Sequence, residues 1–412
     1  MKYGLIGERL GHSFSREIHA RIADYEYELL ELAPDEVGHF LETKEFNAIN
    51  VTIPYKETVI PYLDEISEDA KKIGAVNTIV RKGEKLYGYN TDYFGAEMLI
   101  RSAELDPKGK KVLILGTGGT SKTLSVVVRD MGAREIVKVS RRASAEAVSY
   151  ETALAEHTDA EIIINTTPVG MYPRGNESPI DLGAFSALEG VVDVIYNPLE
   201  TRLVQKARAR GKKAVCGLLM LAAQAVYASA LFLGTERQEA LCEKAYREVL
   251  REKQNVVLIG MPSCGKSTAG AMVAEMLGKT FVDSDDEIVK LTGKSIPEIF
   301  AEGGETEFRR IESEVIASLA AKNGLVIATG GGAVLREENV RALAGNGILY
   351  FLDRSPELLI PTGDRPLSSD REALMCRYRE RYPIYTAAAH VHVLADGTPQ
   401  EVAEQIVKDF SK

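Results

Sequence analysis

The residues best suited to chemistry in this 412-residue chain form a glycine-rich loop at 260–267, with the sequence GMPSCGKS. The loop fits the pattern G-x-x-x-x-G-K-[ST] and directly follows the apolar run 256–259, which we expect to be a strand. Backbone N–H groups of such a loop curl around phosphate, while Lys266 would reach the β- and γ-phosphates and the Ser267 hydroxyl would ligate Mg²⁺. A helix beginning near Ser267 would add its positive end. The loop predicts binding of ATP or GTP and leaves the phosphoryl acceptor open.

Further polar segments in the second half could bind that acceptor. Asp283 and Asp285 follow the run 280–282, where two carboxylates can hold the waters of Mg²⁺ and accept a hydrogen bond from an acceptor hydroxyl. Taken alone, the two carboxylates could instead cap a helix. Four more segments follow: FAEGGETEFR at 300–309, GGGA at 330–333, GDRPL at 363–367 and RYPIY at 381–385. Their glycines would let the backbone approach a ligand closely, and their arginines could hold an anion.

A second glycine-rich turn, GTGGTS at 116–121, follows the apolar run 112–115 and opens a predicted helix. Such a turn places a pyrophosphate at a helix N-terminus, although this one departs from G-x-G-x-x-G and is a weak signal alone. The next predicted strand, 136–139, ends in SRR at 140–142, where an NAD enzyme would offer an acidic residue to the ribose. Arginines suit a 2′-phosphate, so the pattern favours NADP(H), although a solvated basic turn would look the same.

Small polar groups punctuate the first hundred residues, in the segments GHSFS at 11–15, NVTIPYK at 50–56, GAVNT at 74–78 and GYNTD at 88–92. Hydroxyl, amide, amine and carboxylate groups on successive strand ends suit a polyhydroxylated acid. Each residue taken singly is ordinary, because serine, threonine and asparagine are common in turns and caps, and a lone lysine such as Lys56 is usually solvated. The segments indicate a binding site only when they are taken together.

These segments need a scaffold of strands and helices. Apolar runs that alternate with helical patterns predict a small α/β domain followed by a parallel, doubly wound sheet, and a second parallel series begins at 256–259. Because each parallel series opens with its own glycine-rich loop, we expect separate sheets. We therefore predict an α/β protein with an N-terminal substrate-binding domain at 1–105, a Rossmann-type NADP domain at 106–217 and a P-loop kinase domain with a parallel sheet at 254–412. Helices within 218–250 are expected to pack back on the first domain.

Composition limits the partners. The formal net charge is −10 and neither half of the chain is basic, so nothing favours nucleic acid or an anionic membrane surface. Four scattered cysteines without a C-x-x-C pair indicate neither a disulfide framework nor a zinc site. The apolar stretch 217–233 is interrupted by polar residues and predicts a buried helix rather than a membrane span. With no secretory signal at its start, the sequence predicts a cytoplasmic protein with small-molecule substrates.

Residues 1 to about 250 resemble the shikimate dehydrogenases, through the segments above and through NTTPVGM at 165–171, DVIYNP at 193–198 and GLLMLAAQ at 217–224. The resemblance implies that Lys56 and Asp92 are the catalytic pair, and it makes a homodimer the family expectation. The substrate would be bound by Ser13 and Ser15 at its carboxylate and by Thr52, Asn77, Asp92 and Gln224 at its hydroxyls, with Tyr196 nearby. NADP(H) would be held by Gly116, Thr117, Gly118, Gly119, Thr120, Ser140, Arg141, Arg142, Thr166, Thr167, Val194 and Gly217. Ser140 stands where the family usually has asparagine, so the strength of the NADP preference stays open.

Residues 254–412 resemble the shikimate kinases, because D-x-D, G-E-x-x-F-R and G-G-G occur together after the phosphate loop. The resemblance implies that Asp285 hydrogen-bonds the shikimate hydroxyls and that Asp283 lies near Mg²⁺ with Ser267. Arg309 and Arg381 would clamp the substrate carboxylate, for which a bidentate arginine is well suited, and the backbone of Gly330, Gly331 and Gly332 would line the same pocket. Arg365, on a lid, would neutralise charge on the transferring phosphoryl group. The nucleotide would be held by Met261, Pro262, Ser263, Cys264, Gly265, Lys266, Ser267, Thr268 and Arg365.

The two resemblances share one intermediate. Together they predict a bifunctional enzyme of aromatic amino acid (chorismate) biosynthesis, which reduces 3-dehydroshikimate to shikimate with NADPH and then phosphorylates shikimate to 3-phosphoshikimate with ATP. One alternative is a quinate/shikimate dehydrogenase that uses NAD, against which Arg141 and Arg142 argue. The other is a regulatory or binding protein in which one half has lost catalysis. Its expected mark would be the loss of Lys56, Asp92, Lys266 or Asp285, and all four are present.

Overall fold

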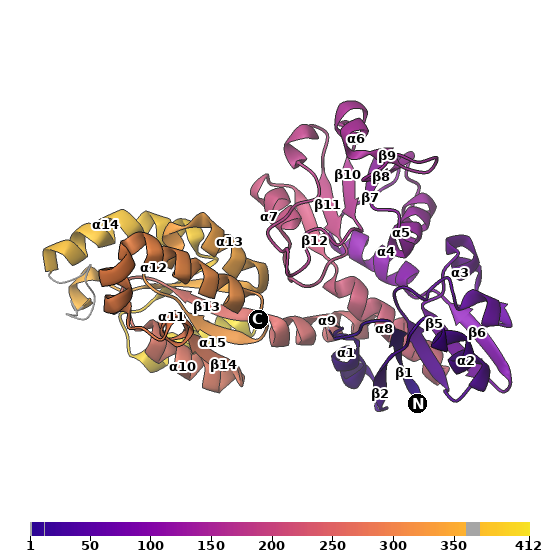
Figure 1. The fold of residues 1–412 in the computed structure, drawn as a ribbon, viewed down its shortest axis with the longest axis horizontal. Helices are drawn as coiled ribbons and strands as arrows, with labels where there is room; N and C mark the ends of the chain where they lie inside the picture. The colour runs from indigo at the N-terminus through magenta and orange to yellow at the C-terminus, as the bar shows by residue number, and fades with distance from the viewer. Residues whose placement is uncertain (1, 12, 360–370) are drawn as a thin grey trace. The chain divides into compact units, whose positions relative to one another are not determined.

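The computed structural model describes residues 2–11, 13–359 and 371–412 of the chain. The chain divides into two compact units, Met1–Val249 and Leu250–Lys412. The first unit holds two sheets and the second holds one, and Figure 1 shows them by colour along the chain. The α/β fold class expected from the sequence is confirmed.

The first sheet is mixed. Its strands, in spatial order, are β2 (Tyr27–Glu31), β1 (Tyr3–Gly7), β3 (Ala48–Val51), β5 (Thr78–Lys82), β6 (Lys85–Tyr89) and β4 (Glu65–Ile66). β5 runs antiparallel to both of its neighbours, with Thr78 opposite Asn50 of β3 and also opposite Tyr89 of β6. The carboxyl ends of β3 and β6 therefore meet the amino end of β5 at one edge of the sheet. That edge gathers three of the polar segments seen in the sequence.

Helices cover this sheet and connect it to the next. They are α1 (Ser15–Ile22), α2 (Glu36–Thr43), α3 (Glu68–Ile73) and α4 (Asp92–Ser102), with a short 3-10 turn at Ile60–Tyr62. A later helix, α8 (Leu218–Leu233), packs against α1 and α4 and is buried along most of its length. It is followed by α9 (Glu239–Lys253). Within the described ranges, no helix has both the length and the apolar character needed to cross a membrane.

The second sheet is entirely parallel, as the alternation of strands and helices predicts. Its strands, in spatial order, are β12 (Lys213–Cys216), β11 (Gly190–Asp193), β10 (Ile162–Asn165), β7 (Lys111–Leu115), β8 (Glu135–Ser140) and β9 (Val148–Ser149). Its helices are α5 (Gly119–Asp130), α6 (Tyr150–Glu156) and α7 (Arg202–Ala209), with a 3-10 turn at Leu182–Ala184. The central strands are apolar and buried, so both faces of the sheet form core.

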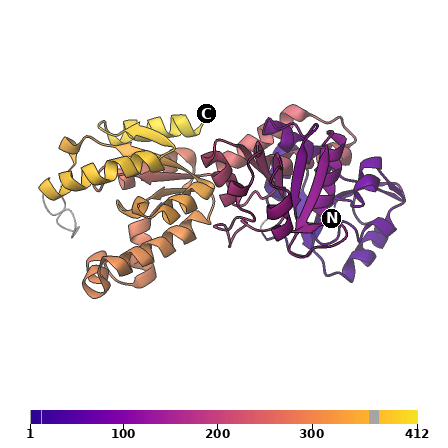
Figure 2. The same ribbon diagram turned by 90° about the horizontal axis from the view of Figure 1, so that it is seen from above.

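The third sheet, in the second unit, is also parallel. Its strands, in spatial order, are β14 (Thr280–Asp283), β15 (Leu325–Ala328), β13 (Asn255–Ile259), β16 (Gly347–Asp353) and β17 (Val391–Leu394). Helices lie on both sides of it (Figure 2): α10 (Lys266–Leu277), α11 (Ser284–Thr292), α12 (Ile296–Ala320), α13 (Glu337–Asn346), α14 (Arg371–Ala388) and α15 (Pro399–Phe410), with 3-10 turns at Ala333–Leu335 and Pro356–Leu358. Because β14, β15 and β13 are neighbours, their carboxyl ends place the segments that follow them side by side.

Candidate active sites

A lysine and a carboxylate meet at the edge of the first sheet where β3 and β6 end and β5 begins. Lys56 lies in the segment after β3, and Asp92 is the first residue of α4, the helix that follows β6. Lys56 Nζ donates a hydrogen bond to Asp92 Oδ2 at 2.6 Å, and the two side chains are only 17% and 11% exposed. The start of α4 favours a negative charge at Asp92. Lys56 is thus a shielded, oriented ammonium and not a solvated surface lysine.

Two amide side chains are tied to the same edge. Asn77 immediately precedes β5, and its Oδ1 accepts a hydrogen bond from the backbone N–H of Thr91 at 2.8 Å. The Thr91 hydroxyl donates to Gln224 Oε1 at 3.4 Å, which connects α8 to the residue before Asp92. The structure therefore brings Asn77 and Gln224 close to Thr91, the residue that precedes Asp92. Thr91 lies in a segment that the sequence singles out, yet no role was predicted for it.

The other predicted substrate residues are placed less directly. Ser13 lies just before α1 and Ser15 is its first residue, and Ser13 Oγ donates to Ser15 Oγ at 3.0 Å. Between them, the Phe14 ring lies 5.3 Å, centroid to centroid, from the ring of Tyr196, which sets Tyr196 beside this loop. Thr52 is held by its backbone, whose N–H donates to Ile6 O at 2.9 Å. No described hydrogen bond joins the Thr52 hydroxyl to the Lys56 pair.

The glycine-rich turn of the second sheet leads into α5, whose first residue is Gly119 and whose N-cap is Gly118. A side chain at either position would meet nothing within 4 Å, so the turn presents an open backbone at a helix N-terminus. Gly116 is different, because its φ is +111° and a Cβ there would lie 2.6 Å from Thr166 Oγ1. The turn and the Thr166 loop therefore lie directly against each other, as a shared dinucleotide site requires.

The exposed Arg141 and Arg142 follow β8, and the Ser140 hydroxyl donates to the carbonyl of Arg142. This bond fixes the turn while leaving both guanidinium groups in solvent, where they can meet an anion. The other residues predicted to hold NADP(H) directly follow β10, β11 and β12: Thr166, Thr167, Val194 and Gly217. Gly217, for example, donates its N–H to Ile195 O at 2.8 Å.

A buried polar cluster, which was not predicted from the sequence, fixes those strand ends. Asp193 Oδ1 accepts from Asn165 Nδ2 at 3.0 Å, and Asp193 Oδ2 accepts from the Thr201 hydroxyl at 2.7 Å. Asn165 Oδ1 in turn accepts from the Thr167 hydroxyl at 2.7 Å. Burial raises the pKa of Asp193 to about 7, although the hydrogen bonds that the carboxylate accepts lower the pKa in part. The cluster holds the loops of Thr167 and Val194 in a fixed relation.

In the second unit, the phosphate loop runs from β13 into α10 as the motif predicts. Lys266 is 8% exposed, and its Nζ donates to the carbonyl oxygens of Gly260 at 3.0 Å and Met261 at 2.8 Å. Ser267 Oγ donates to Asp283 Oδ2 at 2.6 Å, so the two predicted magnesium ligands adjoin one another. Mg²⁺ with a nucleotide needs only one or two protein oxygens besides phosphate, and this pair fits. The described residues contain no larger cluster that could hold a metal unaided.

The residues predicted to bind the phosphoryl acceptor lie around the glycines that follow β15. A Cβ on Gly330 would lie 2.8 Å from Asp285 Oδ1, and a Cβ on Gly332 would lie 2.2 Å from both terminal nitrogens of Arg309. Arg381 donates to Gly331 O at 3.0 Å. A carboxylate and two arginines thus surround one stretch of bare backbone. Arg365 lies outside the described residues.

Three further residues of this pocket were missed from the sequence. Arg309 Nη1 donates to Glu312 Oε2 at 2.7 Å, while Nε and Nη2 reach Glu305 Oε1 at 3.3 and 3.2 Å. Burial raises the pKa of Glu312, with nearby Asp285 adding to the effect and Arg309 opposing it. The Tyr385 hydroxyl donates to the Gly331 carbonyl. A glutamate three residues after an arginine resembles an ordinary exposed helix pair, so its burial could not be inferred.

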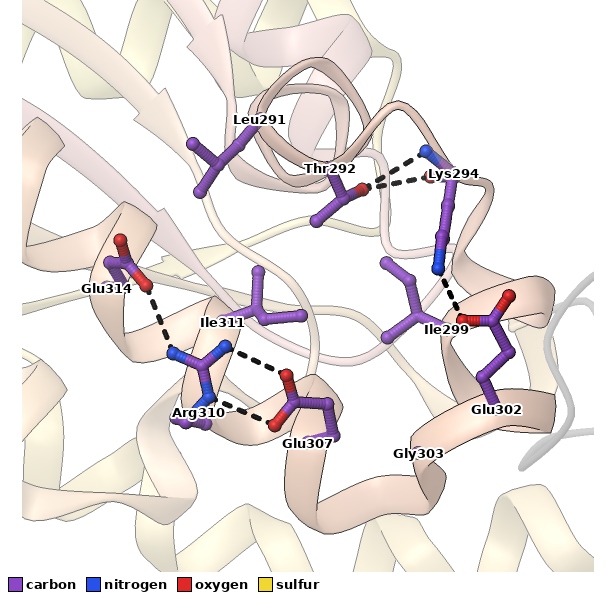
Figure 3. A pocket seen from close by; sticks show the side chains of 10 residues that line it. All are labelled: Leu291, Thr292, Lys294, Ile299, Glu302, Gly303, Glu307, Arg310, Ile311 and Glu314. Atoms are coloured by element: carbon purple, nitrogen blue, oxygen red, sulfur yellow. Dashed lines mark hydrogen bonds and ion pairs between the residues drawn. The ribbon is translucent and has the colours of Figure 1, made fainter.

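A cavity of about 490 Å³ between α11 and α12 contains none of the predicted site residues. It is lined by Leu291, Thr292, Lys294, Ile299, Glu302, Gly303, Glu307, Arg310, Ile311 and Glu314 (Figure 3). Both of its cations are paired, because Arg310 bonds Glu307 and Glu314 and Lys294 bonds Glu302. The cavity therefore offers no uncompensated cation to a phosphate or carboxylate.

Known proteins resemble both units. Family models match residues 5–79 to the shikimate dehydrogenase substrate binding domain and residues 262–411 to shikimate kinase. The chain is 36% identical over 259 residues to shikimate dehydrogenase (NADP(+)) of Clostridium beijerinckii, which covers 59% of this chain and 96% of that protein. It is 40% identical over 276 residues to the Halothermothrix orenii protein of the same name, covering 60% and 95%.

Solved structures agree for the first unit. Shikimate dehydrogenase 1 from Peptoclostridium difficile is similar with a TM-score of 0.56 and 36% identity, over 60% of this chain and 98% of that one. A chorismate mutase/shikimate 5-dehydrogenase fusion protein from Clostridium acetobutylicum is similar with a TM-score of 0.57 and 36% identity, over 61% and 97%. Shikimate 5-dehydrogenase from Thermus thermophilus, solved with NADP(H) and shikimate, gives a TM-score of 0.54 at 29% identity, over 60% and 99%.

Proposed function

This chain belongs to the shikimate dehydrogenase family over its first unit and carries a shikimate kinase domain in its second, and we propose that it catalyses two consecutive reactions. The first is the NADPH-dependent reduction of 3-dehydroshikimate to shikimate. The second is the ATP-dependent phosphorylation of shikimate to 3-phosphoshikimate. The observation that supports this most strongly is the shielded hydrogen bond between Lys56 and Asp92, at 2.6 Å. In the second unit, Asp285, Arg309 and Arg381 lie around the backbone of the glycines at 330–332.

In the reduction, NADPH supplies a hydride to the ketone carbon of the substrate. Lys56 donates the proton to the oxygen that becomes an alkoxide, and its ammonium stabilises the developing charge. Asp92 holds that ammonium in place. Asn77 and Gln224 bind the substrate hydroxyls. Ser13 and Ser15, which form the serine loop at the start of α1, bind the substrate carboxylate.

In the phosphorylation, MgATP supplies the γ-phosphoryl group. Asp285 accepts the hydrogen bond of the attacking hydroxyl, and Arg309 and Arg381 hold the substrate carboxylate. Lys266 exchanges its carbonyl partners for phosphate oxygens. Ser267 and Asp283 are the residues that would hold Mg²⁺.

A coupled assay on the purified chain tests both halves. With 3-dehydroshikimate, NADPH, ATP and Mg²⁺, NADPH loss and ADP release are expected together, because the product of the first reaction is the substrate of the second. Without ATP, only NADPH loss is expected, and shikimate with ATP should release ADP without NADPH. Absence of either signal contradicts the proposal for that unit.

The family likeness also supports, as part of this proposal, a homodimer and a cytoplasmic location.

Replacing both Arg141 and Arg142 with alanine is expected to lower kcat/KM for NADPH on the order of 10- to 100-fold, because losing one charge-assisted hydrogen bond to the 2′-phosphate costs about 1.5–3 kcal/mol. The value for NADH should stay unchanged, since NADH lacks the 2′-phosphate. Arg129→Ala removes an exposed cation from the far end of α5 and serves as the control. An unchanged ratio of NADPH to NADH activity would favour the NAD-using alternative.

A further inference from the structure

The amide of Asn77 is held from one side only. Its Oδ1 accepts from the Thr91 backbone N–H at 2.8 Å and from the Thr78 hydroxyl at 3.0 Å, while the Thr91 hydroxyl, whose single proton goes to Gln224, lies 3.2 Å away. A backbone N–H can only donate, so the oxygen end of the amide must face it. Nδ2 then points the other way and has no hydrogen-bond partner among the described residues, although Asn77 is only 3% exposed. Asn77 therefore presents two N–H donors and no acceptor to a ligand.

Thr78 is fully buried beneath Asn77 and receives a hydrogen bond itself, from Asn50 Nδ2 at 3.0 Å. The orientation of Asn50 is also determined, because its Nδ2 donates to the Asn77 carbonyl at 3.3 Å and its Oδ1 accepts from the Tyr27 hydroxyl at 2.7 Å. A threonine hydroxyl has a single proton. With a donor from Asn50 on its oxygen, Thr78 is left to direct that proton toward Asn77 Oδ1, or toward Thr91 Oγ1 at 3.3 Å.

Gln224 repeats the same arrangement on α8. Its Nε2 donates to the Leu221 carbonyl at 3.0 Å, and its Oε1 accepts from the Thr91 hydroxyl at 3.4 Å. The oxygen end of this amide is thus also engaged by the protein. The second N–H of Gln224 Nε2 is available to donate to a ligand. Both amides are thus tied to Thr91, which directly precedes Asp92, the partner of Lys56.

We propose that Thr78 is a positioning residue for substrate binding, because its hydrogen bond fixes the Asn77 amide so that this side chain turns only N–H donors to the substrate. This inference rests on the proposed reduction, because it assigns the substrate that the donors meet. The substrate oxygen that meets Asn77 acts as a hydrogen-bond acceptor, as a hydroxyl or ketone oxygen can, and without that acceptor the buried N–H donors of Asn77 would stay unpaired.

Three variants test this. Thr78→Val keeps the shape and removes the hydroxyl, and it is expected to raise KM for 3-dehydroshikimate about tenfold with kcat changed less than about threefold, the effect of one buried hydrogen bond. Thr78→Ser should restore KM. Asn77→Asp keeps an oxygen toward Thr91 but replaces the N–H donors with a second oxygen, and should raise KM about 100-fold or more. KM for NADPH and the kinase activity of the same chains should remain at their unmodified values.

The inference and the proposed function fail in different ways. If the unmodified chain does not reduce 3-dehydroshikimate, the proposed function is wrong. If it does, a Thr78→Val variant with normal KM, a serine variant as impaired as the valine variant, or an Asn77→Asp variant that binds normally would overturn the inference alone. A valine variant in which kcat and both KM values worsen together would assign Thr78 a merely structural role and would also overturn it.

Discussion

Lys56→Ala is expected to lower kcat for the reduction of 3-dehydroshikimate by about 10³-fold, within the range of ~10²–10⁴ that a positioned proton donor contributes. The ammonium serves twice, because it delivers the proton and stabilises the alkoxide that forms. Its removal also leaves Asp92, whose side chain is 11% exposed, without the cation it contacts at 2.6 Å. The measurement is the steady-state rate of NADPH oxidation, with substrate binding followed separately by calorimetry.

Substrate binding by the Lys56→Ala variant should remain detectable, because Asn77, Gln224 and the serine loop are unchanged. Lys71→Ala is a matched control, since it removes a lysine from an exposed ion pair with Glu68 in the same unit. Exposed pairs of this kind contribute little to stability. Phosphorylation of shikimate by both variants should match the unmodified chain. A near-normal kcat for Lys56→Ala would eliminate the proposed role.

Asp285→Asn is expected to lower kcat for shikimate phosphorylation by about 100-fold or more, because a carboxylate that accepts the proton of the attacking hydroxyl contributes ~10²–10⁴. The substitution preserves shape, which matters where Asp285 Oδ1 lies 2.8 Å from the position of a Gly330 Cβ. ADP release with shikimate and ATP is the measurement. NADPH oxidation by the same protein should be unaffected.

The neighbouring Asp286 offers a close control. It lies in the same first turn of α11 but is exposed, so Asp286→Asn removes the same charge from the same helix end. Any effect through the helix dipole is common to both variants. Equal activities in the two variants would show that Asp285 has no special role.

Local patterns predicted the nucleotide loops because strand, glycine turn and helix follow one another in the chain. The strand at β13 and the helix at α10 lie where the motif requires them, and the parallel order of the second and third sheets follows from alternation. The mixed order of the first sheet was not predicted. Its β4 is only two residues long and pairs with β6, which no periodic pattern indicates.

Contacts between distant residues account for the rest. Thr91 and Gln224 are 133 positions apart, and the register that places Asn50 opposite Thr78 depends on how two short strands pair. The shielding of Lys56 follows from this pairing and not from its neighbours in sequence. Asn50 and Thr78 lie inside the polar segments 50–56 and 74–78, so the sequence placed them near the predicted substrate site. Their function became visible only through the hydrogen bonds that fix the amide of Asn77.

The three glycines at 330–332 also limit how the second unit can evolve. A methyl group at Gly330 would strike the Asp285 carboxylate, one at Gly331 would strike the ring of Pro262, and one at Gly332 would strike the guanidinium of Arg309, each at under 3 Å. The three collisions involve different neighbours, so no single second substitution relieves them all. Each replacement in the run would therefore require a movement of its own neighbour. A lineage that exchanged all three glycines would have to displace Asp285, Pro262 and Arg309 separately.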